Sequence, residues 1–229
     1  MTRIRYRPFR HGDFDDVADI IGQTWYQDYG DAYGAQAQQL LGEINLATDL
    51  RRTTWTQVAL VDKELVGFML ARAGNASRQT DAMWKSRADG AHDALHAYNS
   101  EVTDMLDGYL RDENRVHEEM QASSDCDQRY EVVTFIVTPE SRGHGIGREL
   151  FERTEDHLAS QGATEFFLYT NKTCNWGFYE HLGLDRAAEY ITTDDDSELM
   201  HPEYYIYVDK LDGCAGAEEE EMLLCSEAA

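Results

Sequence analysis

The stretch "TPESRGHGIGREL", Thr138 to Leu150, places three glycines within five residues and then continues as a helical pattern. The run before it, "YEVVTFIVTP", is rich in β-branched residues and almost wholly apolar from Val132, so it predicts a central strand buried on both faces. Between a strand and a helix, glycines let backbone N–H groups converge, and the helix N-terminus adds about half a positive charge. Residues 142–147 are therefore a candidate anion site, although a tight turn without a ligand explains them equally well.

Two common nucleotide-binding loops do not match this stretch. A P-loop requires a lysine directly after its last glycine, and no such lysine is present. The dinucleotide fingerprint G-x-G-x-x-G requires its third glycine one residue later and repeated βαβ units, whereas a hairpin and a helical segment precede this loop. The loop alone leaves its ligand open.

Before the glycine loop, the sequence predicts a strand, two helices and a hairpin. The first strand ends at Pro8, and Asp13 is the expected N-cap of a helix with apolar residues at helical spacing. A second helix is expected over residues 35–46. "TQVALVD" and "LVGFMLARAG" predict the two strands of a hairpin, with its turn at Lys63 and Glu64.

After the glycine loop, helical and strand patterns continue to alternate. The helix that follows the loop is expected to end before Gly162, and Gly183 is the expected C-terminal cap of a later, short helix. The elements predicted here are a strand over 164–170, the short helix over 174–183, and strands over 184–191 and 203–210. The sequence thus predicts one α/β domain over residues 1–211, followed by an acidic tail over 212–229 that we expect to be flexible.

The segment from about residue 76 to 127 has a different pattern. Its apolar residues recur at alternating steps of four and three, a period of 3.5 that is typical of helix. These residues are Trp84, Ala88, Ala91, Leu95, Tyr98, Val102, Met105 and Tyr109. We expect Gly90 and Gly108 to weaken or break the helix. The segment is interpreted as an inserted helical hairpin that covers the core, and a lid, a substrate wall or a homodimer seam is compatible with this.

Composition limits the partners. The chain has 44 acidic and 20 basic residues and a formal net charge of −24, which argues against nucleic acid or an anionic membrane as a partner. No run approaches the roughly 20 apolar residues of a membrane span, and the basic start lacks the apolar core of a secretory signal. The four cysteines lack metal-site spacing, so we expect free thiols, a cytoplasmic location and no metal.

Two motifs together suggest a family. Arg142, Gly145 and Gly147 form R-x-x-G-x-G after the buried strand, and "NWGFYEHLGL", Asn175 to Leu184, follows downstream. The first resembles the acetyl-CoA loop of the GNAT superfamily of N-acyltransferases, and the second resembles that superfamily's F-Y-E-x-x-G-[FL] segment. The resemblance implies a mixed, mostly antiparallel central sheet that is splayed at the glycine-loop strand and flanked by helices.

The same resemblance implies acetyl-CoA as the co-substrate. Its pantetheine would lie in the splay, hydrogen-bonded to the backbone around Ile136 and Val137. Its pyrophosphate would lie on the backbone of the glycine loop, formed by Arg142, Gly143, His144, Gly145, Ile146 and Gly147. His144 also fits an exposed, variable loop position.

The family's chemistry is direct attack of an amine on the thioester, without an acyl-enzyme. Alkylamines titrate at about 10.4, so a base has to remove a proton, and the departing thiolate benefits from an acid. Tyr179 matches the family's tyrosine that acts as this acid, although it also fits the packed face of a short helix. Glu131 is the first candidate for the base, with Asp125 and Asp127 as rivals and an exposed structural glutamate as the alternative.

One position departs from the family pattern. The family's asparagine often lies seven residues before the tyrosine, where this chain has Lys172. Asn171 and Asn175 flank that position, and either is a candidate for contacting the cofactor. Cys174 has no evident partner that would lower its pKa, so it is expected to pack rather than to react.

These observations predict an N-acetyltransferase that moves an acetyl group from acetyl-CoA to a primary amine of a small molecule or a peptide. Trp25, Tyr26, Tyr29, the helical insertion and "DDDSE", residues 194–198, are expected to shape the amine site. Such an aromatic and acidic wall suits a cationic amine, although the acidic loop also reads as a solvated turn. The alternative is a non-catalytic, CoA-binding regulatory protein that uses the insertion for assembly.

Overall fold

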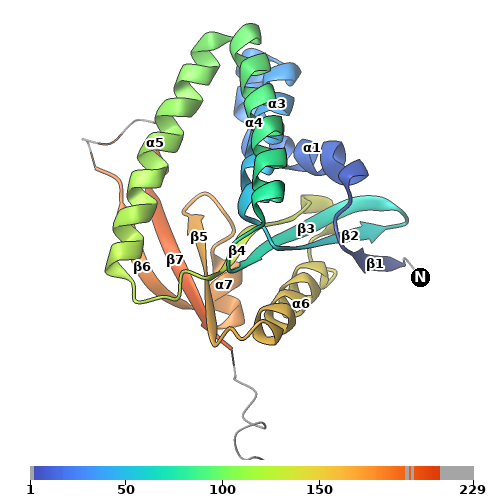
Figure 1. The fold of residues 1–229 in the computed structure, drawn as a ribbon, viewed down its shortest axis with the longest axis vertical. Coiled ribbons are helices and arrows are strands. Elements are labelled where there is room, and N and C mark those ends of the chain that lie inside the picture. The colour runs from blue at the N-terminus through green and yellow to red at the C-terminus, as the bar shows by residue number, and fades with distance from the viewer. Residues whose placement is uncertain (1–2, 194–195, 197–198, 212–229) are drawn as a thin grey trace, which may run out of the picture.

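The computed structural model describes residues 3–193, 196 and 199–211 (Figure 1). Within them, seven strands form one sheet in the order β1-β2-β3-β4-β5-β7-β6. The strands are β1 (Ile4–Arg7), β2 (Trp55–Val61), β3 (Glu64–Ala73), β4 (Tyr130–Val137), β5 (Glu165–Asn171), β6 (Asp185–Ile191) and β7 (Glu203–Lys210). The acidic tail expected over 212–229 and most of the loop 194–198 lie outside the described residues.

Helices cover both faces of this sheet. They are α1 (Phe14–Trp25), α2 (Gln27–Tyr33), α3 (Ala35–Arg52), α4 (Arg78–Tyr98), α5 (Ser100–Ser123), α6 (Ile146–Ser160) and α7 (Gly177–Leu182). Side chains of α6 and α7 pack on one face. The other face is covered by α1, α3 and α4 over the β2–β4 half, and by α5 over β5 and β7.

The sheet opens at its centre. Every neighbouring pair of strands is antiparallel except β4 and β5, which are parallel and pair only at Glu131↔Phe167 and Val132↔Leu168. The register with β3 shifts between Leu70↔Thr134 and Ala71↔Val132, which leaves Val133 as an extra residue on β4. Such a bulge bends a strand, and it follows directly after the last β4–β5 pair. The expected mixed sheet, splayed at the glycine-loop strand, is confirmed.

The bulge also changes which faces of β4 are buried. Val132 packs against the α6 side of the sheet, whereas Ile136 packs against α1 and α3 on the other side. Val133, Phe135 and Val137 are half-buried, so the expectation of a strand buried on both faces was wrong for its second half. A strand that has lost one neighbour has one side left open, and this explains the difference.

Two long helices occupy the segment between β3 and β4. They form a hairpin whose arms diverge: α4 lies beside α3, and α5 reaches over to β6 and β7 (Figure 1). The chain turns at Asn99, whose side chain accepts hydrogen bonds from the amides of Glu101 and Val102 and so caps α5. The hairpin therefore straddles the opening between β4 and β5.

Several predicted boundaries differ from the structure. Gly90 and Gly108 lie inside α4 and α5, so the expected helix breaks there were wrong. Both positions are open to solvent, and a helical glycine costs only about 1 kcal/mol, which tertiary packing overrides. The hairpin turn lies at Asp62 and Lys63, one residue earlier than expected.

Two helices have other lengths than the sequence predicts. The helix expected over 35–46 continues to Arg52, and the short helix expected from residue 174 begins only at Gly177. The extension of α3 has a functional consequence, because its last turns carry Asp49 and Arg52 to the middle of the sheet.

Candidate active site

The glycine loop presents a row of free backbone amides. Among the described residues, none of the six consecutive N–H groups from Gly143 to Arg148 has an acceptor, and the first amide with one is Glu149, which donates to the Gly145 carbonyl at 3.0 Å. The N-terminus of α6 also has no side-chain cap. Free amides at a helix N-terminus attract an anion, because each donates a hydrogen bond and the helix dipole favours negative charge.

Two glycines make this loop possible. Gly145, at the N-cap of α6, has a φ of 79°, in the left-handed region that glycine adopts without strain. Gly147 packs closely: a Cβ there would lie 3.2 Å from the Phe135 ring. The loop thus depends on glycine once for its backbone conformation and once for its packing.

The opened edge of β4 leads directly to this loop. Beyond Val132, β4 keeps its pairing with β3 as far as Val137, but it has no paired residue on β5. Backbone groups on that edge, around Ile136 and Val137, are therefore available to a ligand that adds itself to the strand. The Val137 carbonyl also accepts a hydrogen bond from Arg142 Nε at 3.2 Å.

Tyr179 lies on α7 and packs against the aromatic core beneath the opening. Its ring centroid is 6.2 Å from that of Phe151 and 5.7 Å from that of Tyr207. Burial raises the pKa of Tyr179 well above its usual range, with smaller contributions from Cys174 and Tyr207. The side chain keeps some accessible surface, and its hydroxyl has no hydrogen-bond partner within the described part of the chain. Tyr179 is therefore a protonated phenol whose proton is available to a ligand.

The other residues predicted to bind the cofactor differ in whether their polar groups already have hydrogen-bond partners. Asn171, at the end of β5, accepts hydrogen bonds from the backbone and hydroxyl of Thr173, so its carboxamide oxygen is already engaged. Asn175 is exposed. His144 is exposed in the loop, with Nδ1 3.0 Å from the Arg142 carbonyl.

Glu131 lies in a buried ion-pair network. It stands at the start of β4, its side chain is 2% exposed, and its two oxygens accept from Arg52 and from Arg72. The Arg72 Nη2–Oε2 distance is 2.8 Å. Both oxygens are thus held by guanidinium groups, which leaves Glu131 poorly placed to take a proton from a substrate.

The two rivals of Glu131 lie before β4, at the end opposite to the glycine loop. Asp125 is exposed, and Asp127 pairs with the exposed Arg129. Hydrogen bonding from Arg129 lowers the pKa of Asp127. Neither is brought together with Tyr179.

A largely half-buried polar cluster on the opposite side of the opening was missed by the sequence. Thr134 of β4 donates to Asp49 Oδ2 at 2.6 Å, and Tyr109 of α5 donates to Glu113 at 2.5 Å. Burial raises the pKa of both carboxyls. Burial, with a smaller effect of Arg52, also lowers the pKa of the nearby His117 to about 4, so this imidazole is neutral at pH 7.

The reasons for missing these residues are specific. Asp49 lies beyond residue 46, where the predicted helix ends. Tyr109 belongs to the apolar pattern of period 3.5, which hides its polar role. The signal in the sequence is the i, i+4, i+8 spacing of Tyr109, Glu113 and His117, which places them on one face of α5.

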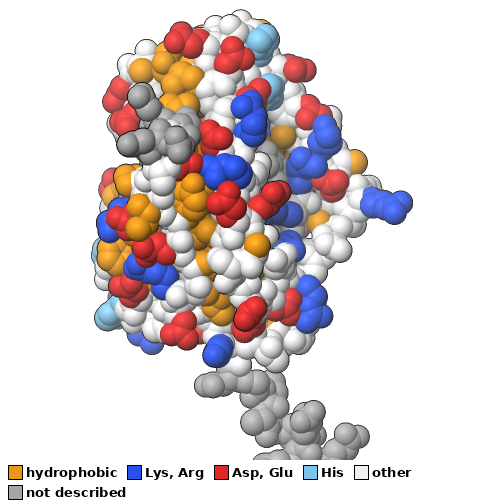
Figure 2. All heavy atoms as spheres, turned by 90° about the vertical axis from the view of Figure 1, so that its left-hand side faces the viewer, with side chains coloured by type: hydrophobic (Ala, Val, Ile, Leu, Met, Phe, Trp, Pro, Cys, Tyr) orange, Lys and Arg blue, Asp and Glu red, His pale blue; other side chains and the backbone are white. Residues whose placement is uncertain are grey.

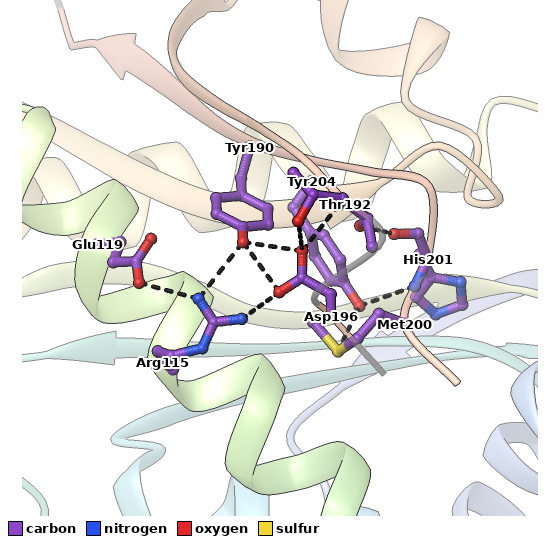
Figure 3. Close-up of polar contacts among 9 residues, drawn as sticks. Arg115, Glu119, Tyr190, Thr192, Asp196, Met200, His201 and Tyr204 are labelled. Carbon is purple, nitrogen blue, oxygen red and sulfur yellow. Dashed lines mark hydrogen bonds and ion pairs between the residues drawn. The ribbon is translucent and has the colours of Figure 1, made fainter. Parts of the chain in front are cut away.

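Polar contacts tie α5 to the loop between β6 and β7 (Figure 3). Arg115 of α5 pairs with Asp196 and, at 2.9 Å, with Glu119. Tyr190 of β6 donates to Asp196 from 3.0 Å. Acidic and basic side chains are interspersed over this face of the molecule (Figure 2). The contacts fix α5, with its inward-facing polar residues, beside the opening of the sheet.

A separate hollow of about 410 Å³ lies elsewhere on the molecule. It is bounded by the start of the chain, the end of α3 and the start of α4, and it is lined among others by Phe9, His11, Asn75 and Trp84. None of the predicted catalytic or cofactor-binding residues lines it, so we assign it no part in the candidate active site.

Among the described residues, no group of three or more histidine, cysteine, aspartate or glutamate side chains is arranged to hold a metal ion. Their helices likewise include none with the length and apolarity needed to cross a membrane.

Solved structures share this fold at low sequence identity. An aminoglycoside 6'-acetyltransferase type Ii is 16% identical, covering 90% of this chain and 97% of its own, with a TM-score of 0.51. PH1933 from Pyrococcus horikoshii OT3 is 13% identical, covering 91% and 98%, with a TM-score of 0.52. The protein smu.2055 from Streptococcus mutans UA159 is 13% identical, covering 91% and 99%, with a TM-score of 0.50. No curated protein matches the sequence.

At such identities the structural likeness shows the fold alone. The sequence itself, however, matches the model of the acetyltransferase (GNAT) family over residues 14–184, well over half of its 229 residues. The matched region spans the bulged strand, the glycine loop with its free amides and the helix that carries Tyr179. This protein belongs to the acetyltransferase (GNAT) family.

Proposed function

We propose that this protein transfers an acetyl group from acetyl-CoA to a primary amine by direct attack, without an acyl-enzyme. The observation that carries the proposal is the row of six free amides, Gly143 to Arg148, at the end of a strand whose neighbour has moved away. An anionic group on the loop, continued by an extended chain along β4, is the shape of coenzyme A. Membership of the family supports the same donor.

The donor would be held mainly by backbone. The amides of Gly143 to Arg148 would bind the pyrophosphate, with the N-terminus of α6 adding its dipole. The open edge of β4 around Ile136 and Val137 would hydrogen-bond the pantetheine amides. Asn175, which is exposed, is better placed than Asn171 for a further contact, because Asn171 already accepts from Thr173.

Tyr179 would act as the acid. The amine nitrogen forms a bond to the thioester carbonyl carbon, the carbon–sulfur bond breaks, and the sulfur leaves with the electron pair. Tyr179 would give its phenolic proton to this thiolate. Its raised pKa keeps the proton in place until then, and its hydroxyl is uncommitted.

The acceptor would enter from the side of α2 and α5. Tyr26 and Tyr29 lie edge to face there, with ring centroids 6.1 Å apart. Burial, the charge of Glu113 and the charge of Asp49 together raise the pKa of Tyr26. Aromatic rings and carboxyl groups together favour a cationic amine. Aminoglycosides belong in the panel of acceptors because one protein of the same fold is named for acetylating them.

Calorimetric titration with acetyl-CoA, ATP and NAD, followed by thiol release across polyamines, aminoglycosides and peptide amines, tests the proposal. We expect binding of acetyl-CoA alone and thiol release with at least one cationic amine. Binding of acetyl-CoA without thiol release for any amine would contradict catalysis and favour the non-catalytic, CoA-binding alternative.

Tyr179→Phe tests the assignment of the acid. We expect turnover to fall by about 100-fold, the scale of general-acid contributions, while the affinity for acetyl-CoA changes less than about twofold. Tyr98→Phe is the matched control, because Tyr98 is exposed on α4 and its hydroxyl donates to the Tyr33 carbonyl. Equal turnover of the two variants would remove Tyr179 from the mechanism.

A further inference from the structure

The proposed reaction needs a group that removes a proton from the amine. Three carboxyls lie near the opening of the sheet, and they differ in how their oxygens are engaged. Glu131 accepts from two arginines. Asp49 accepts from Thr134 at 2.6 Å and lies 3.6 Å from Arg52. Glu113 accepts only from the Tyr109 hydroxyl, so its second oxygen has no hydrogen-bond partner among the described residues.

Glu113 lies on the inner side of α5. The same side of the helix carries Tyr109 one turn before it and His117 one turn after it, and His117 stacks on Tyr169 of β5 with ring centroids 3.8 Å apart. Val116 and Met120 of this helix are buried against β5 and β7. The side chain of Glu113 is half-buried, so it is desolvated and still reachable.

Electrostatic effects link Glu113 to the residue proposed as the acid. Burial is the main cause of the raised pKa of Cys174, and the charge of Glu113 raises it further. Burial and then Cys174 raise the pKa of Tyr179. Cys174 thus lies within electrostatic range of both residues.

We propose that Glu113, supplied by the inserted helix α5, is the base that takes the proton from the attacking amine. This assignment rests on the proposed acetyl transfer. The substrate ammonium gives one proton to the free carboxylate oxygen of Glu113, directly or through one water. The neutral nitrogen then attacks the thioester. As the adduct collapses, the leaving sulfur takes the proton of Tyr179, and the second proton of the nitrogen passes through solvent to restore the phenol. Glu113 returns its own proton to solvent after the product leaves.

The surroundings of Glu113 suit this role. Burial raises the pKa of Glu113; the hydrogen bond from Tyr109 opposes this, the charge of Asp49 adds to it, and Arg52 opposes it. A carboxyl whose pKa is raised toward the working pH is a better proton acceptor than one with an ordinary pKa. The titratable groups that interact electrostatically with it are Tyr109 on its own helix and, on other segments, Tyr26, Asp49, Arg52, Cys174 and Tyr204.

Glu113→Gln, compared with Glu118→Gln, tests the assignment. Glu118 is exposed on the same helix and serves as the matched control. With the best amine at pH 7, we expect Glu113→Gln to lower kcat by about 100-fold and to change the acetyl-CoA affinity less than about twofold. The control should keep wild-type kcat. A kcat of Glu113→Gln within about threefold of wild type, in a protein that melts normally, would overturn the proposal.

The pH profile separates a base from a merely structural residue. Because a larger share of the amine is neutral at higher pH, the deficit of Glu113→Gln should shrink steadily from pH 7 toward pH 10. A deficit that stays constant with pH would instead show a structural role. Should the amide variant fail to fold, Glu113→Asp decides: a base role requires the acidic limb of kcat/KM to persist with a shifted midpoint, and an unshifted limb overturns it.

The outcome also distinguishes this inference from the proposed function. A wild-type protein that releases no thiol with any amine contradicts the acetyl transfer itself, and the role of Glu113 falls with it. A wild-type protein that is active, with an unaffected Glu113→Gln variant, contradicts the role of Glu113 alone.

Discussion

The two sides of the opening between β4 and β5 differ in the groups they present: one presents backbone and the other presents side chains. On the side that would bind acetyl-CoA, here called the donor side, a ligand meets backbone amides of the glycine loop and the unpaired edge of β4. On the side that would bind the amine, here called the acceptor side, a ligand meets side chains from α3, α5 and the bulged part of β4. Most of these side chains are ionisable and contact one another. A backbone site recognises one chemical shape, whereas a side-chain site can be changed residue by residue without altering the fold.

The difference also lies in what each side needs from the rest of the chain. The donor side is continuous in sequence, since β4, the loop and α6 follow one another. The acceptor side joins segments more than 60 residues apart, for example Asp49 and Glu113, and it exists only because α5 reaches across to β6 and β7. We therefore expect donor-side and acceptor-side substitutions to separate cleanly in binding experiments.

The largest effect is expected from Glu131→Gln, at the base of the acceptor side. Loss of this carboxylate leaves Arg52 and Arg72 without their shared partner. Breaking a fully buried pair costs about 3–5 kcal/mol. Because Arg52 is 43% exposed, we expect a smaller decrease in the free energy of unfolding, by about 2–3 kcal/mol. Denaturant melting measures it.

Glu152→Gln is the control for this substitution, because it removes only an exposed i,i+4 pair with Arg148 and should change stability little. Equal stabilities of the two variants would contradict a structural role of Glu131. Turnover of the folded Glu131→Gln protein, set beside that of Glu113→Gln, then shows which carboxyl acts as the base.

An intermediate effect is expected on the donor side from Gly145→Ala. At a φ of 79°, a residue with a Cβ is strained by about 1–2 kcal/mol, and the amides on either side would shift. We expect the affinity for acetyl-CoA to fall about tenfold, measured by calorimetry, with the KM for the amine unchanged. Gly90→Ala, in the open interior of α4, should leave affinity unchanged; equal affinities of both variants would argue against the loop as the pyrophosphate site.

The smallest effect is expected from Arg115→Ala, which releases the β6–β7 loop from α5. The contact is a surface one, so we expect the KM for the amine to rise by about threefold and the affinity for acetyl-CoA to stay the same. Steady-state kinetics and calorimetry measure the two. Lys85→Ala, which removes an exposed ion pair on α4, is the control. If Arg115→Ala instead changed the affinity for acetyl-CoA and left the KM for the amine unchanged, Arg115 would belong to the donor side.

Much of the donor side could be predicted from the sequence, because its information is local. Gly145 and Gly147 mark a strand-to-helix turn whatever surrounds them, and the structure gives each a separate reason to be glycine. The motif R-x-x-G-x-G does not require a glycine at Gly143, although that residue has a φ of 78°. The sequence also set the end of α3 too early, since the polar residues Asp49 and Arg52 look solvent-exposed until Thr134 and Glu131 are seen to contact them.

By itself, then, the sequence determined the strands, most of the helices and the glycine loop with Tyr179 downstream, since periodicity, turn residues and short motifs act over a few positions. It did not show the helix α2. Tertiary structure decided the rest. The bulge at Val133 separates β4 from β5, and whether a strand bulges depends on the register with β3. The arrangement of α5 over β7 places Glu113 near Cys174, and packing between distant segments, not the pattern within either one, sets that position. For the same reason Glu131, an ordinary strand residue in sequence, becomes an arginine-bound carboxylate in the fold.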